Sequence, residues 1–161
     1  MREQVPGIVL RTTVMAGFPG ETEAEFLELK AFLSWAGIER IGAFLYSPEE
    51  GTEAAGLPGR VPREEGCRRL DELLALGAGI RDGFHESRVG TEDDAFVEER
   101  FGRRAVARTR GEAPEVDPVV LASGSARAGA RVRVVITGRE GPNLTARIVQ
   151  VDQREDSPLD P

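Results

Sequence analysis

The sequence predicts an α/β region followed by a small all-β barrel. Three observations predict this division: a strand, helix and strand pattern in the first 46 residues, a helical period after Pro62, and a change to strand period after Gly90. The 161 residues suffice for one domain or two small ones, and 40% hydrophobic with 30% charged residues is an ordinary globular balance.

The first predicted strand is the β-branched run 8–16, and the loop Gly-Phe-Pro-Gly-Glu at 17–21 follows it directly. One explanation of this tight loop is turn chemistry, because glycine accepts backbone angles that other residues avoid and proline fixes its own. The other is that ligands sit at the carboxyl ends of strands in α/β proteins. The five residues leave both explanations open.

A helix is predicted to open at Thr22, which stands three residues before Glu25 as in a capping box. Gly37 is a natural stop for it. The apolar face is expected to comprise Phe26, Leu29, Phe32, Leu33 and Ala36. The next strand, 41–46, has apolar residues on both sides, which predicts burial on both faces in a parallel sheet. Strand, helix and strand then form a right-handed crossover unit.

A long loop rich in Gly and Pro, 47–61, follows the second strand, again at a carboxyl end. Pro62 suits the first turn of another helix, and leucines continue the helical pattern to Leu76. Each of Gly77, Gly79 and Gly83 weakens a helix by about 1 kcal/mol relative to Ala, so we expect the helix to fray or bend before His85.

Five short strands are expected after Val89: 95–99, 104–108, 119–122, 131–137 and 144–149. Glycines and a proline separate them. Five strands in about 60 residues predict a small closed barrel of the OB type. The polar residues 153–161 are expected to form a disordered tail.

The charge is uneven along the chain. Residues 1–86 hold 9 basic and 15 acidic side chains, and residues 87–161 hold 12 and 13. Neither half has the positive excess that drives non-specific nucleic-acid binding. No apolar run approaches the length that spans a bilayer, and nothing indicates secretion, so we expect a cytoplasmic protein without a membrane partner. The single cysteine, Cys67, excludes an internal disulfide.

Three stretches carry a family resemblance: LRTTVMAGFPGETEAEF at 10–26, IGAFLYSPEEGTEAA at 41–55 and RTRGEAPEVD at 108–117. In this order and spacing they resemble the radical-SAM methylthiotransferases. They are most similar to the RimO subfamily, which modifies an aspartate of a small-subunit ribosomal protein. The tRNA-modifying relatives usually carry arginine at the place of Glu49 or Glu50, and EAPEVD is similar to the DAPEID signature of the ribosomal-protein subfamily.

The resemblance implies an architecture of two parts and a tail. Residues 1–86 resemble the carboxyl-terminal part of a partial (β/α) radical-SAM barrel, and residues 87–152 resemble a TRAM domain, an OB-like barrel that helps to hold the substrate. In this family, loops at the carboxyl ends of barrel strands form the wall of the S-adenosylmethionine (SAM) site. The implied cofactor-binding residues are Gly17, Phe18, Pro19, Gly20, Glu21, Phe44, Tyr46 and Ser47. On residue type alone, Tyr46 is more typical of strand-end packing than of stacking on a base.

The chain also departs from the family. The family binds a [4Fe-4S] cluster through a C-x-x-x-C-x-x-C loop and a second cluster through three further cysteines, and this chain has neither set. Since one thiol supplies one ligand, no cluster is expected in this chain, and no catalytic or metal-binding residue is predicted. The chain is interpreted as a carboxyl-terminal fragment of a RimO-like transferase that is inactive alone.

Two functions of different classes remain: a fragment of a SAM-dependent methylthiotransferase, or a non-catalytic TRAM module that binds ribosomal protein or RNA. For either, the charge favours a basic ribosomal small-subunit protein as partner, and we expect RNA binding to be weak. The acidic residues predicted to bind this substrate are Glu49, Glu50, Glu112, Glu115 and Asp117. The alternative for these carboxylates is that they are merely solvated.

Overall fold

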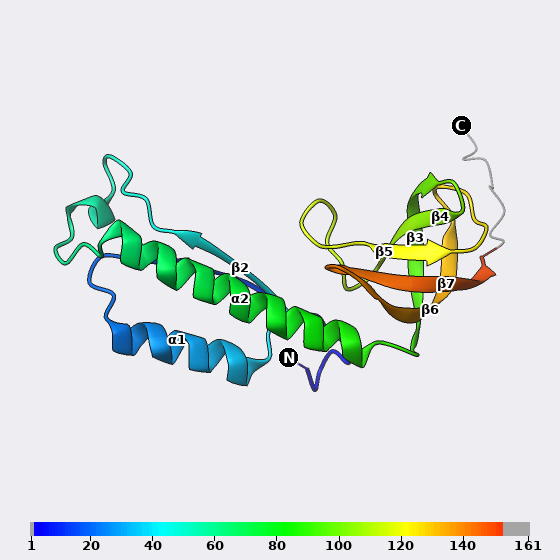
Figure 1. Ribbon diagram of the computed structural model, residues 1–161, viewed down its shortest axis with the longest axis horizontal. Coiled ribbons are helices and arrows are strands. Elements are labelled where there is room, and N and C mark those ends of the chain that lie inside the picture. Colours follow the sequence, from blue (N-terminus) through cyan, green and yellow to red (C-terminus); the bar gives the residue numbers. More distant parts are fainter. Residues whose placement is uncertain (1, 153–161) are drawn as a thin grey trace. The chain divides into compact units, whose positions relative to one another are not determined.

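The computed structural model describes residues 2–152, and the chain divides into two compact units between Phe84 and His85. The first unit contains two strands, one whole helix and most of a second helix, and the second unit contains five strands (Figure 1). Each unit has its own hydrophobic core. The prediction of an α/β region followed by an OB-like barrel is confirmed.

The strands β1 (Arg11–Ala16) and β2 (Arg40–Leu45) pair in parallel, with Met15 opposite Phe44. Val14, Ile41 and Ala43 pack against the core beneath the helices. The other face of the sheet is open, because Met15 is 36% and Phe44 is 46% exposed. The predicted burial of the second strand on both faces is therefore wrong for this structure: the helices cover one face only.

Helix α1 (Glu23–Ala36) begins with the predicted capping box. The Glu25 amide donates to the Thr22 hydroxyl, and the Thr22 amide donates to the Glu25 carboxylate at 2.8 Å. The helix ends at Gly37, which adopts φ +57°. Phe26 and Leu33 are buried. The expectation that Phe32 belongs to the apolar face is wrong: Phe32 is half exposed, because only positions at i, i+3 and i+7 from Phe26 point at the core.

Helix α2 (Arg63–Ser87) follows a short 3₁₀ helix, η1 (Glu53–Gly56), and continues past all three glycines. The expected fraying before His85 is wrong. Gly77 is buried against β2, where an added Cβ would lie 3.2 Å from the Ile41 carbonyl oxygen. The same face carries Gly66, whose added Cβ would lie 2.7 Å from Leu45. Close packing on β2 therefore offsets the weak helix propensity of these two glycines.

The second unit is a closed barrel of β3 (Glu92–Phe101), β4 (Arg104–Thr109), β5 (Val120–Ser123), β6 (Arg131–Glu140) and β7 (Asn143–Val151). The order around the barrel is β3-β4-β5-β7-β6, and only the pair β5–β7 is parallel. Its core is built from valines, alanines, Ile136 and Leu144. All five predicted strands are present. The predicted disordered tail, 153–161, lies outside the described residues.

Candidate functional site

A small cavity lies at the carboxyl ends of β1 and β2, where the family resemblance implies a cofactor site. Its volume is about 160 Å³. Three segments form its wall: the loop after β1, the end of β2, and the chain that enters α2. The lining residues are Gly17, Pro19, Leu45, Tyr46, Pro48, Arg60, Val61, Pro62, Arg63 and Gly66.

Backbone packing explains why the loop after β1 is so tight. Gly17 adopts φ +77°, and an added Cβ would lie 3.3 Å from Leu45 and 3.4 Å from the Cα of Gly66. The amide of Gly20 donates to the carbonyl of Gly59 at 2.8 Å, and an added Cβ on Gly59 would lie 3.3 Å from the Gly20 backbone. The glycines thus let three segments meet backbone to backbone.

Tyr46 is one of the polar residues that line this cavity, together with Arg60 and Arg63. Its amide donates to the Ala16 carbonyl at 2.8 Å, and its ring meets Phe18 edge-on with the centroids 5.4 Å apart. The hydroxyl is buried and has no hydrogen-bond partner among residues 2–152. Buried hydroxyls are nearly always paired, so an unpaired one in a residue that lines a cavity is a candidate contact for a bound molecule.

Three of the eight predicted cofactor-binding residues line the cavity: Gly17, Pro19 and Tyr46. The others do not line it. Phe44 lies on the open face of the sheet, and the carboxylate of Glu21 accepts from the Gly17 amide and from Arg69. Phe18, Gly20 and Ser47 are exposed beside it.

The sequence interpretation missed the third wall, residues 60–63 and Gly66. The long loop before α2 was recognised as lying at a strand end. Nothing local to it indicates which part returns to the first loop, because the contact joins segments about 40 residues apart.

No group of three or more His, Cys, Asp or Glu side chains in residues 2–152 is arranged to hold a metal ion. The thiol of Cys67 is free and partly exposed.

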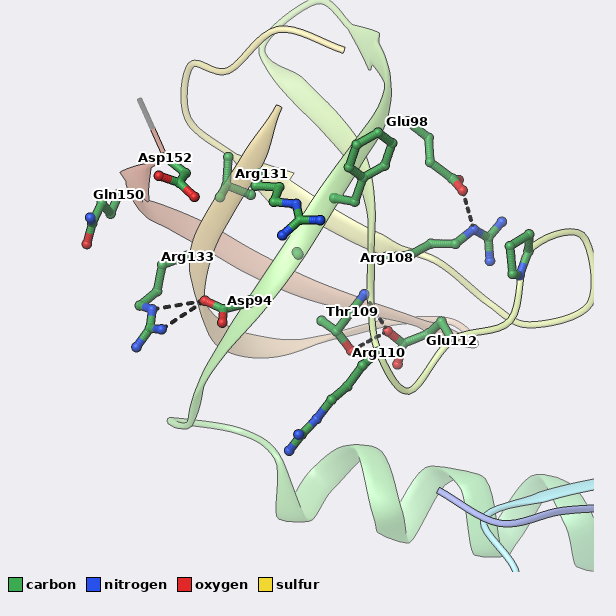
Figure 2. A pocket seen from close by; sticks show the side chains of 14 residues that line it. Asp94, Glu98, Arg108, Thr109, Arg110, Glu112, Arg131, Arg133, Gln150 and Asp152 are labelled. Atoms are coloured by element: carbon green, nitrogen blue, oxygen red, sulfur yellow. Dashed lines mark hydrogen bonds and ion pairs between the residues drawn. The ribbon is translucent and has the colours of Figure 1, made fainter. Parts of the chain in front are cut away.

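A larger cavity of about 740 Å³ lies on the barrel (Figure 2). Strands β3, β4 and β6 contribute most of its wall, and the rest comes from the loop residues Arg110, Glu112 and Pro114 and from Gln150 and Asp152. Two of its arginines are neutralised locally: Arg108 donates to Glu98 at 2.7 Å, and Arg133 to Asp94 at 2.9 Å. Arg110 and Arg131 form no ion pair within residues 2–152, and Phe96 on the same wall is 48% exposed. The cavity therefore offers two guanidinium groups without an ion pair in the described residues, and one half-exposed aromatic ring on its wall.

Glu112 is part of the barrel's internal support. It is 5% exposed and accepts from Arg88 at 2.6 Å and from the Thr109 hydroxyl at 2.6 Å. Burial alone would raise the pKa of the Glu112 carboxyl, but Arg88 and the hydrogen bonds from Thr109 outweigh it and hold the pKa below its ordinary value. Glu112 reaches the cavity wall as an ion-paired carboxylate.

Beyond Glu112, the EAPEVD segment forms a loop held by internal hydrogen bonds and by Arg108. The Ala113 amide donates to the Asp117 carboxylate at 2.7 Å, and Arg108 donates to the Ala113 and Asp117 carbonyls. Glu115 lies at the exposed tip with φ +61°. Of the five acidic residues predicted to bind substrate, Glu49, Glu50 and Glu115 are exposed, and Glu112 and Asp117 are engaged in shaping the loop.

Residues 89–149 match the TRAM domain family. The chain is also similar to curated proteins named ribosomal protein uS12 methylthiotransferase RimO. It is 40% identical over 151 residues to the one from Desulforudis audaxviator, and 45% identical over 149 residues to the one from Thermotoga petrophila. These matches cover 92% of this chain and 34% and 35% of the relatives.

The relative from Bacteroides fragilis is 46% identical over 121 residues, which are 74% of this chain and 28% of that protein. The resemblance drawn from the three sequence stretches is thus confirmed, and a TRAM domain is present. The chain spans about a third of the length of the curated relatives it matches. No helix within residues 2–152 has the length and apolar character to cross a membrane.

Proposed function

We propose that this chain is the carboxyl-terminal part of a RimO-like methylthiotransferase that acts in the cytoplasm on a ribosomal small-subunit protein. The observation that carries the proposal is the 40–45% identity to RimO proteins over 92% of the chain. The TRAM match at 89–149 on a self-closing barrel supports it.

In this proposal the cavity beside Tyr46 forms part of the wall of the SAM site. Leu45, Val61 and Pro62 give apolar walls, and the unpaired Tyr46 hydroxyl gives one polar contact. The volume of about 160 Å³ lies below the roughly 300 Å³ at which ordinary small-molecule sites begin, so these residues would hold only part of the cofactor. When bound, SAM supplies the chemistry that adds a methylthio group to a substrate carbon.

Iron–sulfur clusters do not fit the residues of this chain. The family's clusters each require three cysteines, and Cys67 is the only one here. In the proposed enzyme both clusters are bound by the remaining two thirds of the protein, and this chain is inactive without it.

A chimaera tests the proposal. The matching third of the Thermotoga petrophila enzyme is replaced by this chain, and methylthiolation of its uS12 is followed by mass spectrometry under anaerobic conditions. We expect modified uS12 from the chimaera, and a reduced rate from a chimaera with Tyr46→Phe, which removes only the hydroxyl. A chimaera that folds and binds its clusters but leaves uS12 unmodified would refute the proposal.

We further propose that the exposed acidic residues attract the basic substrate protein. Glu49, Glu50 and Glu115 carry the accessible charge, while Glu112 and Asp117 fix the shape of the loop that presents Glu115. The excess of acidic residues in 1–86 repels phosphate and draws in a lysine- and arginine-rich loop, mainly through the association rate. Salt should weaken this attraction.

Titration of the chain with uS12, tRNA and ribosomal RNA at moderate salt decides the partner. We expect uS12 to bind most tightly, and Glu115→Gln to slow its association while Glu140→Gln, a charge change on β6, leaves it unaltered. Tighter binding to either RNA would end this assignment.

The barrel cavity favours a second candidate function, a non-catalytic binding module. A cavity of about 740 Å³ with two arginines free of ion pairs in the described residues suits an anionic group of a partner. Residues 85–152 alone would then bind uS12 or RNA as tightly as the full chain does. Binding by the full chain that is lost in residues 85–152 favours the enzyme part over the module.

A further inference from the structure

The loop after β1 is closed by the side chain of its own last residue. The Gly17 amide donates to Oε2 of Glu21 at 2.7 Å, and the Glu21 amide donates to the Phe18 carbonyl at 3.0 Å. The Glu21 side chain is only 12% exposed. The loop conformation therefore depends on keeping a carboxylate in a nearly dry position, which is unfavourable without a counter-charge.

Arg69 on α2 provides that counter-charge. Its Nη1 donates to Oε2 of Glu21 at 2.9 Å and to the Glu21 carbonyl at 3.0 Å, and its side chain is 6% exposed. The Nε of Arg69 donates to Glu65 at 2.9 Å, and the guanidinium lies 5.4 Å from the centroid of the Phe26 ring. A planar fork fixed on several sides in this way suits arginine and not lysine, which presents a point charge.

We propose that Arg69 is a positioning residue: through Glu21 it fixes the Gly17 amide and the loop that forms one wall of the cavity beside Tyr46. Gly17 and Pro19 line that cavity, whereas Arg69 and Glu21 do not. Loss of the guanidinium leaves the Glu21 carboxylate buried without a partner cation. The Glu21 carboxylate then rotates into solvent and releases the Gly17 amide. The loop at 17–21 is then no longer held at a fixed distance from Tyr46. The link to a cofactor rests on the proposed function, but the link from Arg69 to Gly17 does not.

The neighbouring residue provides a matched control. Arg68 is on the same helix, is 43% exposed, and pairs with Glu23, Glu65 and Glu72. It shares Glu65 and Glu23 with Arg69, but within the described residues it forms no hydrogen bond or ion pair with Glu21. Arg68→Met therefore removes one positive charge from the same helix. It leaves intact the contacts from Arg69 to Glu21 and from Glu21 to the Gly17 amide, which we call the loop clamp.

Amide hydrogen exchange by NMR on the full chain tests the clamp without any ligand. Because hydrogen bonds to charged groups are stronger than those between neutral groups, Arg69→Met should speed exchange at the Gly17 amide roughly tenfold or more. Exchange at Phe26 and Leu33 in the core should stay unchanged, as should Gly17 in Arg68→Met. Arg69→Lys should restore Gly17 protection only in part. Protection of Gly17 that survives in Arg69→Met, or is lost equally in Arg68→Met, would overturn the proposal.

A second variant covers the case in which Arg69→Met unfolds the first unit. Glu21→Gln keeps an acceptor oxygen for Gly17 but removes the attraction to Arg69, and should give intermediate exchange at Gly17 with the core intact. Unchanged exchange there overturns the clamp. A separate NMR titration of the wild-type chain with SAM tests the cofactor site. If the amide chemical shifts of Tyr46 and Gly17 do not change, the cofactor site is contradicted. The loop clamp is then still tested by the exchange measurements alone.

Discussion

The two sheets of this chain differ in how their edges and faces are satisfied. In the barrel every strand has two neighbours, so no edge is left unpaired and the inner faces form one core. Within residues 2–152, β1 and β2 have only each other, and the face with Met15 and Phe44 is open. Isolated two-stranded sheets are marginal in water, so β1 and β2 depend on the helices packed on their other face. We therefore expect two unfolding transitions, with the first unit melting before the barrel.

Arg88→Met is the variant with the largest expected effect on the stability of the barrel. The change removes the Arg88 guanidinium from the buried Glu112 carboxylate, which costs about 3–5 kcal/mol. Urea unfolding followed by barrel amide signals should show a lower midpoint, while the transition of the first unit stays in place. Arg104→Met, which removes an exposed pair with Glu140, is the control and should have an effect below about 1 kcal/mol.

Two core truncations test whether the units unfold independently. Leu144→Ala in the barrel and Leu33→Ala in α1 each remove a fully buried leucine and should cost about 2–5 kcal/mol. Each should shift only the transition of its own unit in a thermal scan followed by NMR. A shift of both transitions by either variant would contradict the independence of the two units.

Acid should destabilise the barrel through Glu112. Its pKa is held below the ordinary 4.5, so its contribution to stability is complete above pH 4.5 and is lost as the pH falls through the lowered value. Glu112→Gln should therefore flatten the fall in barrel stability below pH 4.5. Urea midpoints measured at several pH values provide the test, and an unaltered slope in Glu112→Gln would show that other carboxylates dominate.

Two glycine substitutions in α2 test how closely this helix packs on β2, and their expected effects on stability are the smallest. Gly79 has open space around an added Cβ, so Gly79→Ala should stabilise the first unit by about 0.5–1 kcal/mol. Gly77→Ala gains the same helix propensity but forces a methyl group against the backbone of Ile41, and should give no gain or a loss. Equal stabilisation by both would show that α2 does not lie tightly on β2.

Local signals in the sequence predicted local structure well. The capping box of α1 lies within four residues, and the alternation of Val132, Val134 and Ile136 reveals β6 directly. The same reasoning misjudged Phe32 and the glycines of α2. Side-chain burial depends on which elements lie opposite, and this information is not local to either segment.

At the candidate site too, contacts between distant segments could not be predicted from the sequence. The loop after β1 was recognised from its glycines, but its wall at residues 60–66 comes from a contact between distant segments. Glu112 was assigned to the substrate because its charge is evident, whereas its burial depends on Arg88, which lies 24 residues earlier in the chain. Charge can be counted from a sequence, but its availability depends on the partners that folding brings near.

The strand order of the barrel has a consequence for synthesis on the ribosome. Of the strands in residues 2–152, β7 is made last; it lies between β5 and β6 and supplies the parallel pairing that closes the ring. Until residues 143–151 have left the exit tunnel, β5 lacks one of its neighbours and the inner valines remain accessible. The α/β unit has no such constraint, because all of its strands and helices precede residue 88. During translation the α/β unit therefore has the opportunity to fold before the barrel can close.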